Sequence, residues 1–523
     1  MSTPPMKILF SMRHSGALRN FASTVEELAR RGHRIHLIFM RRDKLGESRL
    51  LHELTRAHST ITYSEPIDKV QRPWVPLARA IRSVGDYARY RAPEYRDAHA
   101  LRDRATRHLA PSMRKFVGLP LIRSRAGLAL VTRVLRFVER AIPADPFVLE
   151  VVRSQAPDLL LVTPLVDFAS AQEEYVKAAR TLGIPSGLCV HSWDNLTNKG
   201  LIHVHPDLVF VWNGAQVREA ATLHGIETEH IVPTGAPCYD QWFTRGPSTT
   251  RAEFCQKVGL PSEKPYLLYL CSSQFIAPRE ADFVKRWVQA LRSASDPRVR
   301  ESSVLIRPHP RNDMSRWKRF DLAEFPHVVL WPGEGANPVD AGSKNDYFDS
   351  LYHSAAAVGI NTSAQIEAGI AGRQVFSIRA PEYAATQEGT LHFRYLLNEH
   401  GGLLHMSGTV EEHTRAIARV FDRSDEDERK LAKFVEGFVR PRGIDVPATP
   451  LLADEIERLG HLRVEPLTQS IWVRVLRRLL RPIAVRMKIA RPSVERPGAN
   501  PAEADGKPAA VGDRFEKKRE WVH

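Results

Sequence analysis

Hydrophobic and polar positions alternate along the chain in blocks that have the lengths of strands and helices. Apolar runs at residues 7–11 and 35–40 are separated by a helical pattern in which Val25 and Leu28 share one face. Gly32 follows the helical pattern, as expected at the C-terminus of a helix. A crossover of this kind between two apolar runs places both strands parallel in one sheet. The chain therefore opens with a predicted β-α-β unit.

The same alternation of strands and helices continues through two long stretches of the chain. The first stretch contains helix-length segments at residues 169–182 and 214–224, and the polar string TRGPSTTRAEF separates it from the second. This order predicts an α/β protein with two Rossmann-like, doubly wound domains, 1–245 and 246–440, that face a cleft. The remaining predicted strands are 159–162, 187–190, 208–211 and 230–234 in the first domain, and 266–271, 304–307, 328–331, 356–359 and 375–378 in the second.

Two regions depart from this pattern. Residues 71–145 contain Arg-rich amphipathic segments between prolines, which predict a helical insertion in the first domain. Residues 441–492 should form C-terminal helices, and within them residues 471–491 contain seven Lys or Arg and no acidic residue. This segment predicts a basic amphipathic helix that ends or bends at Pro482. Residues 493–523 are rich in Pro, Ala and Gly and are predicted to be disordered.

The composition fits a folded protein with a basic surface. The 523 residues are 43% hydrophobic, which suffices for two substantial cores, and the formal net charge is +15. Such a charge attracts nucleic acid, anionic lipid or phosphorylated substrates. The positive charge gathers in the insertion and in the segment 471–491, without the interleaved aromatic and basic residues of an RNA-binding sheet. We therefore expect an anionic membrane surface, bound through residues 471–491, and no nucleic acid as partner.

The sequence contains no run of apolar residues long enough to span a membrane, and its start leads into a strand pattern without the apolar region of a signal peptide. We expect a cytoplasmic protein, peripheral at the inner face of the cytoplasmic membrane. The four cysteines form no CxxC pair, so neither a disulfide framework nor a zinc site is predicted. No metal and no cofactor are expected.

The string GINTSAQIEAGIAG, which starts at Gly359, is the strongest chemical signal. A strand should end at Gly359, followed by a turn at Asn361 and then by a helix. Open amides at the start of this helix, with the hydroxyls of Thr362 and Ser363, predict a phosphate site. Glu367 lies one turn further on, where it can accept hydrogen bonds from a ribose. A capped helix with a surface glutamate is the structural alternative.

Two further loops of the second domain support a donor site at the same edge. The string VLIRPHPRN places Arg307, His309 and Arg311 after a strand, where open α/β sheets bind ligands. Arg307 can bind a phosphate with two hydrogen bonds, and His309 can donate to a phosphate oxygen. Ser272 and Ser273 follow the first strand of the domain. A solvated basic loop and a plain turn are the respective alternatives.

The string HSWDNLTNKG, at residues 191–200, follows a predicted strand of the first domain. Trp193 suits the apolar face of a sugar, and short polar side chains such as Asn195 suit its hydroxyls. Asp194 or His191 can serve as the general base that deprotonates an acceptor hydroxyl. Asp194 as a turn-forming residue is the alternative.

Together, HSWDNLTNKG, RPHP and NTSAQIEAGIAGRQV resemble GT-B-fold glycosyltransferase-like proteins of the bacterial surface-polysaccharide type, over about residues 6–440. The RPHP string resembles the motif of sialyltransferases and of polyol-phosphate and capsule-polymer transferases, in which the histidine faces the nucleotide phosphates. The string MRHSGALRN resembles the first loop of GT-B enzymes, which implies that Gly16 lets the acceptor approach and that His14 can act as base. No Lys partner follows Arg307, which leaves retaining and inverting transfer open.

These observations predict a metal-independent glycosyltransferase that moves a sugar from a nucleotide-sugar donor to a lipid-linked or cell-envelope glycan acceptor at the membrane surface. A CDP-polyol phosphotransferase, similar to glycerophosphotransferases, suits RPHP equally well. A nucleotide-sugar 2-epimerase would require acids in the cleft and would have no use for a membrane-directed helix. A non-catalytic basic scaffold is the alternative from a different class.

Overall fold

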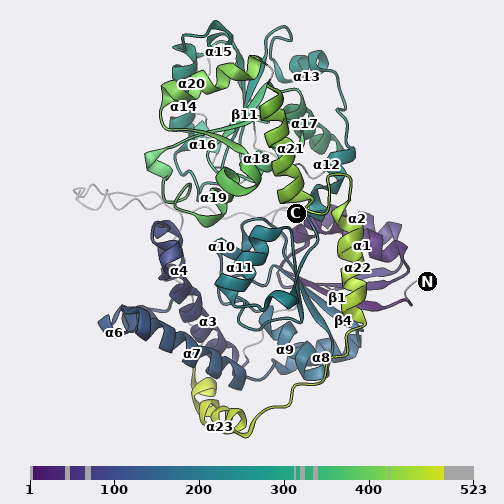
Figure 1. The fold of residues 1–523 in the computed structure, drawn as a ribbon. Coiled ribbons are helices and arrows are strands. Elements are labelled where there is room, and N and C mark those ends of the chain that lie inside the picture. Colours follow the sequence, from purple (N-terminus) through teal and green to yellow (C-terminus); the bar gives the residue numbers. More distant parts are fainter. Residues whose placement is uncertain are drawn as a thin grey trace, which may run out of the picture. The chain divides into compact units, whose positions relative to one another are not determined.

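The computed structural model describes residues 4–41, 48–64, 72–310, 312, 314–317, 324–333, 338, 340–422 and 424–487. Arg311, the end of the predicted basic segment and the predicted disordered tail lie outside the described residues. Within the described part, the strands form two parallel sheets that are surrounded by helices (Figure 1).

The first sheet has seven parallel strands in the order β3-β2-β1-β4-β5-β6-β7. At its centre, Phe10 is paired with Leu37 on one side and with Leu161 on the other. The strands are almost continuously apolar because helices cover both faces of the sheet. The strands are β1 (Lys7–Met12), β2 (Arg34–Phe39), β3 (Ile61–Ser64), β4 (Leu159–Thr163), β5 (Ser186–Cys189), β6 (Leu208–Val211) and β7 (Ile231–Pro233).

The second sheet has six strands in the order β10-β9-β8-β11-β12-β13. Leu268 is paired with Leu305 on one side and with Ala357 on the other, so the sheet is apolar at its centre. The strands are β8 (Tyr266–Leu270), β9 (Ser303–Arg307), β10 (Val328–Leu330), β11 (Ala356–Gly359), β12 (Val375–Ile378) and β13 (Leu404–Ser407).

Local signals account for several helix ends. In α11, Asn213 accepts a hydrogen bond from the amide of Gln216, and Gly225 ends the helix with a φ of 71°. In α13, Thr250 and Glu253 form a reciprocal capping box. Around the first sheet lie α1 (Ala22–Arg30), α2 (Ser48–Ala57), α8 (Pro146–Gln155), α9 (Glu173–Leu182), α10 (Asn195–Asn198) and α11 (Gly214–His224). Helix α12 (Asp240–Thr244) packs its Trp242 and Phe243 against the core of the second domain. With the second sheet are α13 (Arg251–Val258), α14 (Glu280–Arg292), α15 (Pro297–Arg300), α16 (Met314–Trp317), α17 (Ala341–Tyr352), α18 (Ala364–Ile370), α19 (Leu391–Asn398), α20 (Val410–Ala418) and α21 (Asp425–Val439).

The predicted fold class is confirmed, because both domains contain a doubly wound parallel sheet. The strand predictions missed β3 and β13. Both are short edge strands whose sequences, ITYS and LHMS, contain polar residues that are partly exposed. An edge strand is covered by fewer neighbours, so it does not show the continuous apolar run on which the prediction depended.

The Arg-rich insertion is helical and is anchored to the first domain by a buried ion cluster. Arg82 of α3 donates to Glu139 of α7 and to Glu174 of α9, with both N–O distances at 2.6 Å. Lys177 adds a 2.7 Å ion pair to Glu139. The insertion contains α3 (Val75–Arg89), α4 (His99–Arg107), α5 (Pro111–Gly118), α6 (Pro120–Arg123) and α7 (Arg125–Ala141).

The last two described helices return to the first domain. Helix α22 (Ala448–Gly460) lies beside α1 (Figure 1), and its Leu452, Ile456 and Leu459 join the core beneath the first sheet. Helix α23 (Ile471–Arg486) contacts α3 and α7 and continues through Pro482, so the proline does not end it. None of the described helices has both the length and the apolar character needed to cross a bilayer.

Candidate functional site

Residues at the carboxyl ends of strands from both sheets contact each other. Trp193 follows β5, and its Nε1 donates to the hydroxyl of Ser363 after β11 at 3.1 Å. Thr197 Oγ1 lies 3.2 Å from Nδ1 of His392, whose ring meets the Trp193 ring edge-on with centroids 4.9 Å apart. The segment 191–200 of the first sheet is therefore joined directly to the predicted donor segment of the second.

Arg307 ends β9 as a buried cation. Its Cζ lies 4.5 Å from the ring centroid of Tyr347 and 5.4 Å from that of Trp331. Among the described residues, its Nη1 is buried without a hydrogen-bond partner. Burial lowers the pKa of Arg307, against the influence of Tyr347, Asp346 and Glu367. A buried donor without an acceptor is destabilising, so an anion at this position would be bound favourably.

Glu367 lies in α18 and is half-buried. It accepts a hydrogen bond from the hydroxyl of Tyr347. Burial raises the pKa of Glu367, and the Tyr347 hydrogen bond, Arg19 and Arg307 act in the opposite direction. Since Arg19 belongs to the first loop of the first domain, charges from both domains influence this carboxylate.

Asn361 and Ser272 connect two strand-end loops of the second sheet. The amide of Asn361 donates to Ser272 Oγ at 3.1 Å, and its Nδ2 donates to the carbonyl of Thr386 at 2.7 Å. The amide of Thr362 donates to Gln365 Oε1 at 3.1 Å. Asn361 and Ser272 are buried and Thr362 is half-buried. These contacts shape the turn before α18, and the predicted donor-binding roles of the three residues stay predictions.

Three residues that are predicted to bind the donor lie nearer the surface at this edge of the sheet. Ser363 is exposed and accepts from Trp193, which leaves its own proton for another acceptor. His309 is half-buried, and its carbonyl accepts from the amide of Asn312 at 2.9 Å. Ser273 is half-buried where the chain leaves β8. All three follow strands that border the Arg307 site, and their roles stay predictions.

Asp194 is held as an ionised carboxylate. Its two oxygens accept from Ser192 Oγ and Asn198 Nδ2, each at 2.5 Å. Burial raises the pKa of Asp194, but the opposing effects are larger. They come from Lys199, His392 and these hydrogen bonds, and they bring the pKa down to about 2. A carboxylate with this pKa is a weak proton acceptor at neutral pH.

His191 is a neutral ring whose Nε2 carries a lone pair. The Thr163 hydroxyl donates to the carbonyl of Cys189 at 2.7 Å, so it can only accept from Nδ1 of His191, 3.5 Å away. A proton on Nδ1 leaves the lone pair on Nε2. Burial, assisted by Lys199 and opposed by Asp194, lowers the pKa of His191 well below 6.5. The ring is therefore neutral at pH 7.

The other predicted first-domain residues border the same region. His14 is half-buried, Gly16 is buried, and the charge of His14 contributes to the lowered pKa of His191. Asn195 is fully buried, and within the part of the chain that the structure describes neither polar atom of its side chain has a hydrogen-bond partner. The base role of His14 and the acceptor-binding roles of Gly16, Trp193 and Asn195 stay predictions.

The insertion supports this loop through residues that no motif predicted. Arg89 of α3 donates to the carbonyl of Gly200 at 2.8 Å and to that of Lys199 at 3.2 Å. The Tyr90 hydroxyl donates to the carbonyl of Lys199 at 2.6 Å. Helix α3 therefore fixes the backbone after the proposed base. An Arg-rich amphipathic pattern does not reveal which arginines are buried.

Three other site residues were also missed. Arg19 lies in the string MRHSGALRN, and Trp331 is the last residue of the predicted strand 328–331, so the position of each at the end of a strand was an available signal. His392 is the second residue of α19, and no sequence motif identifies it. Its contact with Trp193 arises only when the two domains come together.

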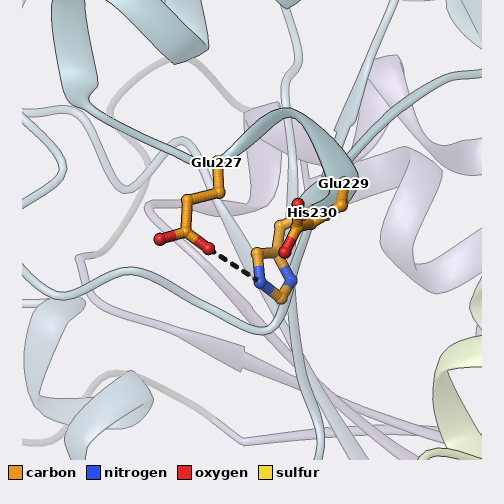
Figure 2. A group of neighbouring side chains, drawn as sticks. All are labelled: Glu227, Glu229 and His230. Atoms are coloured by element: carbon orange, nitrogen blue, oxygen red, sulfur yellow. Dashed lines mark ion pairs between the residues drawn. The ribbon is translucent and has the colours of Figure 1, made fainter.

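Glu227, Glu229 and His230 form an exposed group whose side chains are close enough to share an ion (Figure 2). They precede β7 and so lie at the amino edge of the first sheet. His230 Nδ1 lies 2.9 Å from the carbonyl oxygen of Asp207. Because ligands in such sheets bind at the carboxyl edge, this group is not part of the candidate site.

No protein-family model and no curated protein matches the sequence. Solved structures do match. The glycosyltransferase from Rickettsia africae aligns over 87% of this chain and 98% of its own, with 12% identity and a TM-score of 0.50. The UDP-GlcNAc 2-epimerase from Neisseria meningitidis, bound to UDP-GlcNAc, aligns over 87% and 100%, with 11% identity and a TM-score of 0.48. At such identity the likeness concerns the fold alone. The chain has the two-domain GT-B fold.

Proposed function

We propose that the protein is a glycosyltransferase that binds a nucleotide-sugar at the carboxyl edge of the second sheet. The observation that carries the proposal is Arg307, a buried cation beside two aromatic rings whose Nη1 has no partner among the described residues. A diphosphate supplies both the negative charge and the missing acceptor, and its oxygens match the planar guanidinium. Glu367, close enough to influence Arg307, suits the hydroxyls of the ribose.

Arg307 would also assist the chemical step. As the bond between the anomeric carbon and the donor phosphate breaks, negative charge develops on the leaving diphosphate. A cation that is buried before the reaction stabilises this charge more strongly than one in water, because less solvent screens it. The hydroxyls of Thr362 and Ser363 can donate to the same phosphates.

His191 is the base in this proposal. Its Nε2 takes the proton of the acceptor hydroxyl while the acceptor oxygen attacks the anomeric carbon and the diphosphate leaves. A single displacement of this kind inverts the anomeric configuration. The low pKa of Asp194 and its two hydrogen bonds favour His191 as the base and Asp194 as a fixed charge beside it.

The acceptor that we propose is a lipid-linked or cell-envelope glycan, reached at the cytoplasmic face of an anionic membrane through α23. This helix contains five Arg and no acidic residue, and its Trp472 is 72% exposed. A basic helix with exposed apolar side chains is typical of attachment to a membrane interface.

The test is to incubate the purified protein with a panel of nucleotide-sugars and CDP-polyols, with and without a lipid extract as acceptor. Glycosyl transfer gives acceptor-dependent nucleotide release and an inverted anomer by NMR. An epimerase gives a C2-epimeric nucleotide-sugar, and a polyol phosphotransferase gives CMP from a CDP-polyol only. The variant His191→Gln should bind the donor normally but lose roughly 10²- to 10⁴-fold in turnover. Absence of both nucleotide binding and release would overturn the proposal.

A further inference from the structure

Helix α7 has an apolar stripe on its outer side. Leu130, Val134 and Phe137 are spaced one helical turn apart and are all exposed, with Leu130 at 62%. Phe116 and Leu119, in and directly after α5, are exposed as well. Adjacent exposed side chains of this size are uncommon on a soluble surface unless they contact a partner or a membrane.

Helix α23 has a stripe of the same kind. Its Ala484 is buried in a cluster with Leu77 and Ile142, where the helix packs on α3 and α7. The side chains left exposed share a helical spacing of three or four residues. They are Trp472, Val475, Leu479 and Ile483, and Ile471 and Val485 are exposed as well.

The two stripes belong to neighbouring helices. Helix α23 contacts α7 (Figure 1). Arg477 Nε donates to the carbonyl of Ala141 at 2.9 Å. Helix α23 is therefore docked on the insertion and is not a separate tail. This packing uses one side of the helix and leaves the second apolar stripe without a partner in the described part of the chain.

These helices are strongly basic. Residues 111–141 contain seven Lys or Arg and a single acidic residue, Glu139, which is buried in ion pairs with Arg82 and Lys177. Residues 471–486 contain five Arg and no acid. Apolar stripes bordered only by exposed cations match the interface of an anionic bilayer. A nucleic acid would use the charge but would leave the apolar stripes in water.

A cavity of about 740 Å³ opens between α7, α9 and the start of α23. Arg136, Arg140 and Arg180 line it together with His205. Arg136 and Arg180 form no ion pair among the described residues, and both lie close enough to lower the pKa of His205 beyond the effect of burial. Three acids line the cavity: Glu139 is paired with Arg82, Asp207 accepts from Ser186, and a carboxylate oxygen of Glu227 lies 3.8 Å from Nε2 of His230. Such a cavity suits the phosphate of a lipid headgroup.

We propose that α5–α7 and α23 form one membrane-docking surface, whose apolar stripes enter an anionic bilayer while Arg136 and Arg180 bind a lipid phosphate. The inference extends the membrane attachment through α23, which is part of the proposed function, to the insertion and to a lipid phosphate, and it holds whether or not the protein transfers a sugar. It also assigns the insertion a second task besides supporting the segment 191–200.

The test is flotation of the full-length protein with vesicles of phosphatidylglycerol and phosphatidylcholine, compared with phosphatidylcholine alone. The wild type should float mainly with the anionic vesicles. Two variants, L130S/V134S/F137S in α7 and W472S/L479S in α23, should each reduce binding on the order of tenfold, since each removes apolar area from the interface. The matched control Tyr352→Ser/Val410→Ser, exposed apolar residues of the second domain, should bind like the wild type.

The variant Arg136→Gln/Arg180→Gln should lose binding to the anionic vesicles and keep any weak binding to phosphatidylcholine. Normal flotation of the α7 variant, or equal binding of the wild type to both vesicles, would overturn the proposal. So would binding of RNA without binding of either vesicle. Circular dichroism and nucleotide binding of each variant separate this surface from the donor site, because the docking variants should leave both unchanged.

Discussion

Two buried arginines, one in the insertion and one at the edge of the second sheet, are stabilised in different ways. Arg82 donates to Glu139 and Glu174, and its third donor position is used by the carbonyl of Ser170 at 2.8 Å. Arg307 is buried to a similar degree, with aromatic rings at 4.5 and 5.4 Å and an Nη1 without a partner among the described residues.

The difference separates an arginine that completes the fold from one that awaits a ligand. Removing a charge from water is unfavourable, and carboxylates at short distance compensate for this around Arg82. Aromatic rings compensate only in part, since a cation–π contact contributes about 0.5–2 kcal/mol. The second arginine is therefore the better marker of an anion site, although both occur in Arg-containing apolar segments of the sequence.

The largest effect is expected from Arg82→Gln, which leaves the buried carboxylates of Glu139 and Glu174 with Lys177 as their one nearby cation among the described residues. Breaking such a pair should lower the free energy of unfolding by about 3–5 kcal/mol. Chemical denaturation followed by tryptophan fluorescence measures this change. Donor affinity of the folded variant should be unchanged. A variant that kept its stability but bound the donor weakly would contradict the structural role given to Arg82.

The ion pair between Arg82 and Glu139 makes the stability of the fold depend on pH. Burial raises the pKa of Glu139, but the larger opposing effect of Arg82 and Lys177 brings this pKa well below its ordinary value of 4.5. A carboxylate with a lowered pKa contributes stability above pH 4.5, and this contribution is lost as the pH falls through the lowered pKa. The difference in stability between wild type and Arg82→Gln should therefore shrink in acid, and a constant difference would count against the pairing.

The next effect is expected from Arg307→Met, which keeps the length of the side chain and removes its charge. Donor affinity should fall by about 1.5–3 kcal/mol, the contribution of hydrogen bonds to a charged group. The melting temperature of the ligand-free protein should stay equal or rise, because an incompletely satisfied buried cation has gone. Arg373→Met is the control, since Arg373 lies 5.7 Å from the ring of Tyr352 and donates to the carbonyl of Ser354.

Glu367→Gln should weaken donor binding by about 1 kcal/mol, because a carboxylate is a stronger acceptor for ribose hydroxyls than an amide. In the wild type, burial raises the pKa of Glu367, so affinity should decline on acidification at a higher pH than for an ordinary glutamate. Isothermal titration between about pH 5 and 8 checks both points. If the variant kept the pH dependence of the wild type, Glu367 would not be its source.

The smallest effect is expected from Trp331→Leu, which removes the more distant of the two rings near Arg307. A loss of about 0.5–1 kcal/mol in donor affinity corresponds to a contact of this kind. Competition binding with a fluorescent nucleotide resolves such a change. A loss as large as that of Arg307→Met would mean that the ring holds the base of the nucleotide directly.

Much of the fold follows from periodicity. The predicted strands of both domains recur in the structure within one or two residues of their ends, because buried parallel strands are continuous apolar runs. The edge strands β3 and β13 were missed for the opposite reason. Helix α11, with Asn213 before it and Gly225 after it, shows that local caps define a boundary well.

The candidate site could be predicted only in part. Strand-end strings identify Arg307, Glu367 and His191, because ligands in parallel sheets bind at that edge. The contacts of Trp193 with Ser363 and His392 depend on two domains meeting, and a pattern within either domain does not contain this information. Likewise, an Arg-rich helix shows its total charge but not that Arg89 is buried against the segment 191–200.

The most direct test of the central claim is a crystal structure with the nucleoside diphosphate released in the transfer assay. The account predicts a phosphate oxygen within hydrogen-bond distance of Arg307 Nη1, about 2.7–2.9 Å, with the ribose near Glu367. A nucleotide bound elsewhere, with Nη1 of Arg307 still lacking an acceptor, would contradict it.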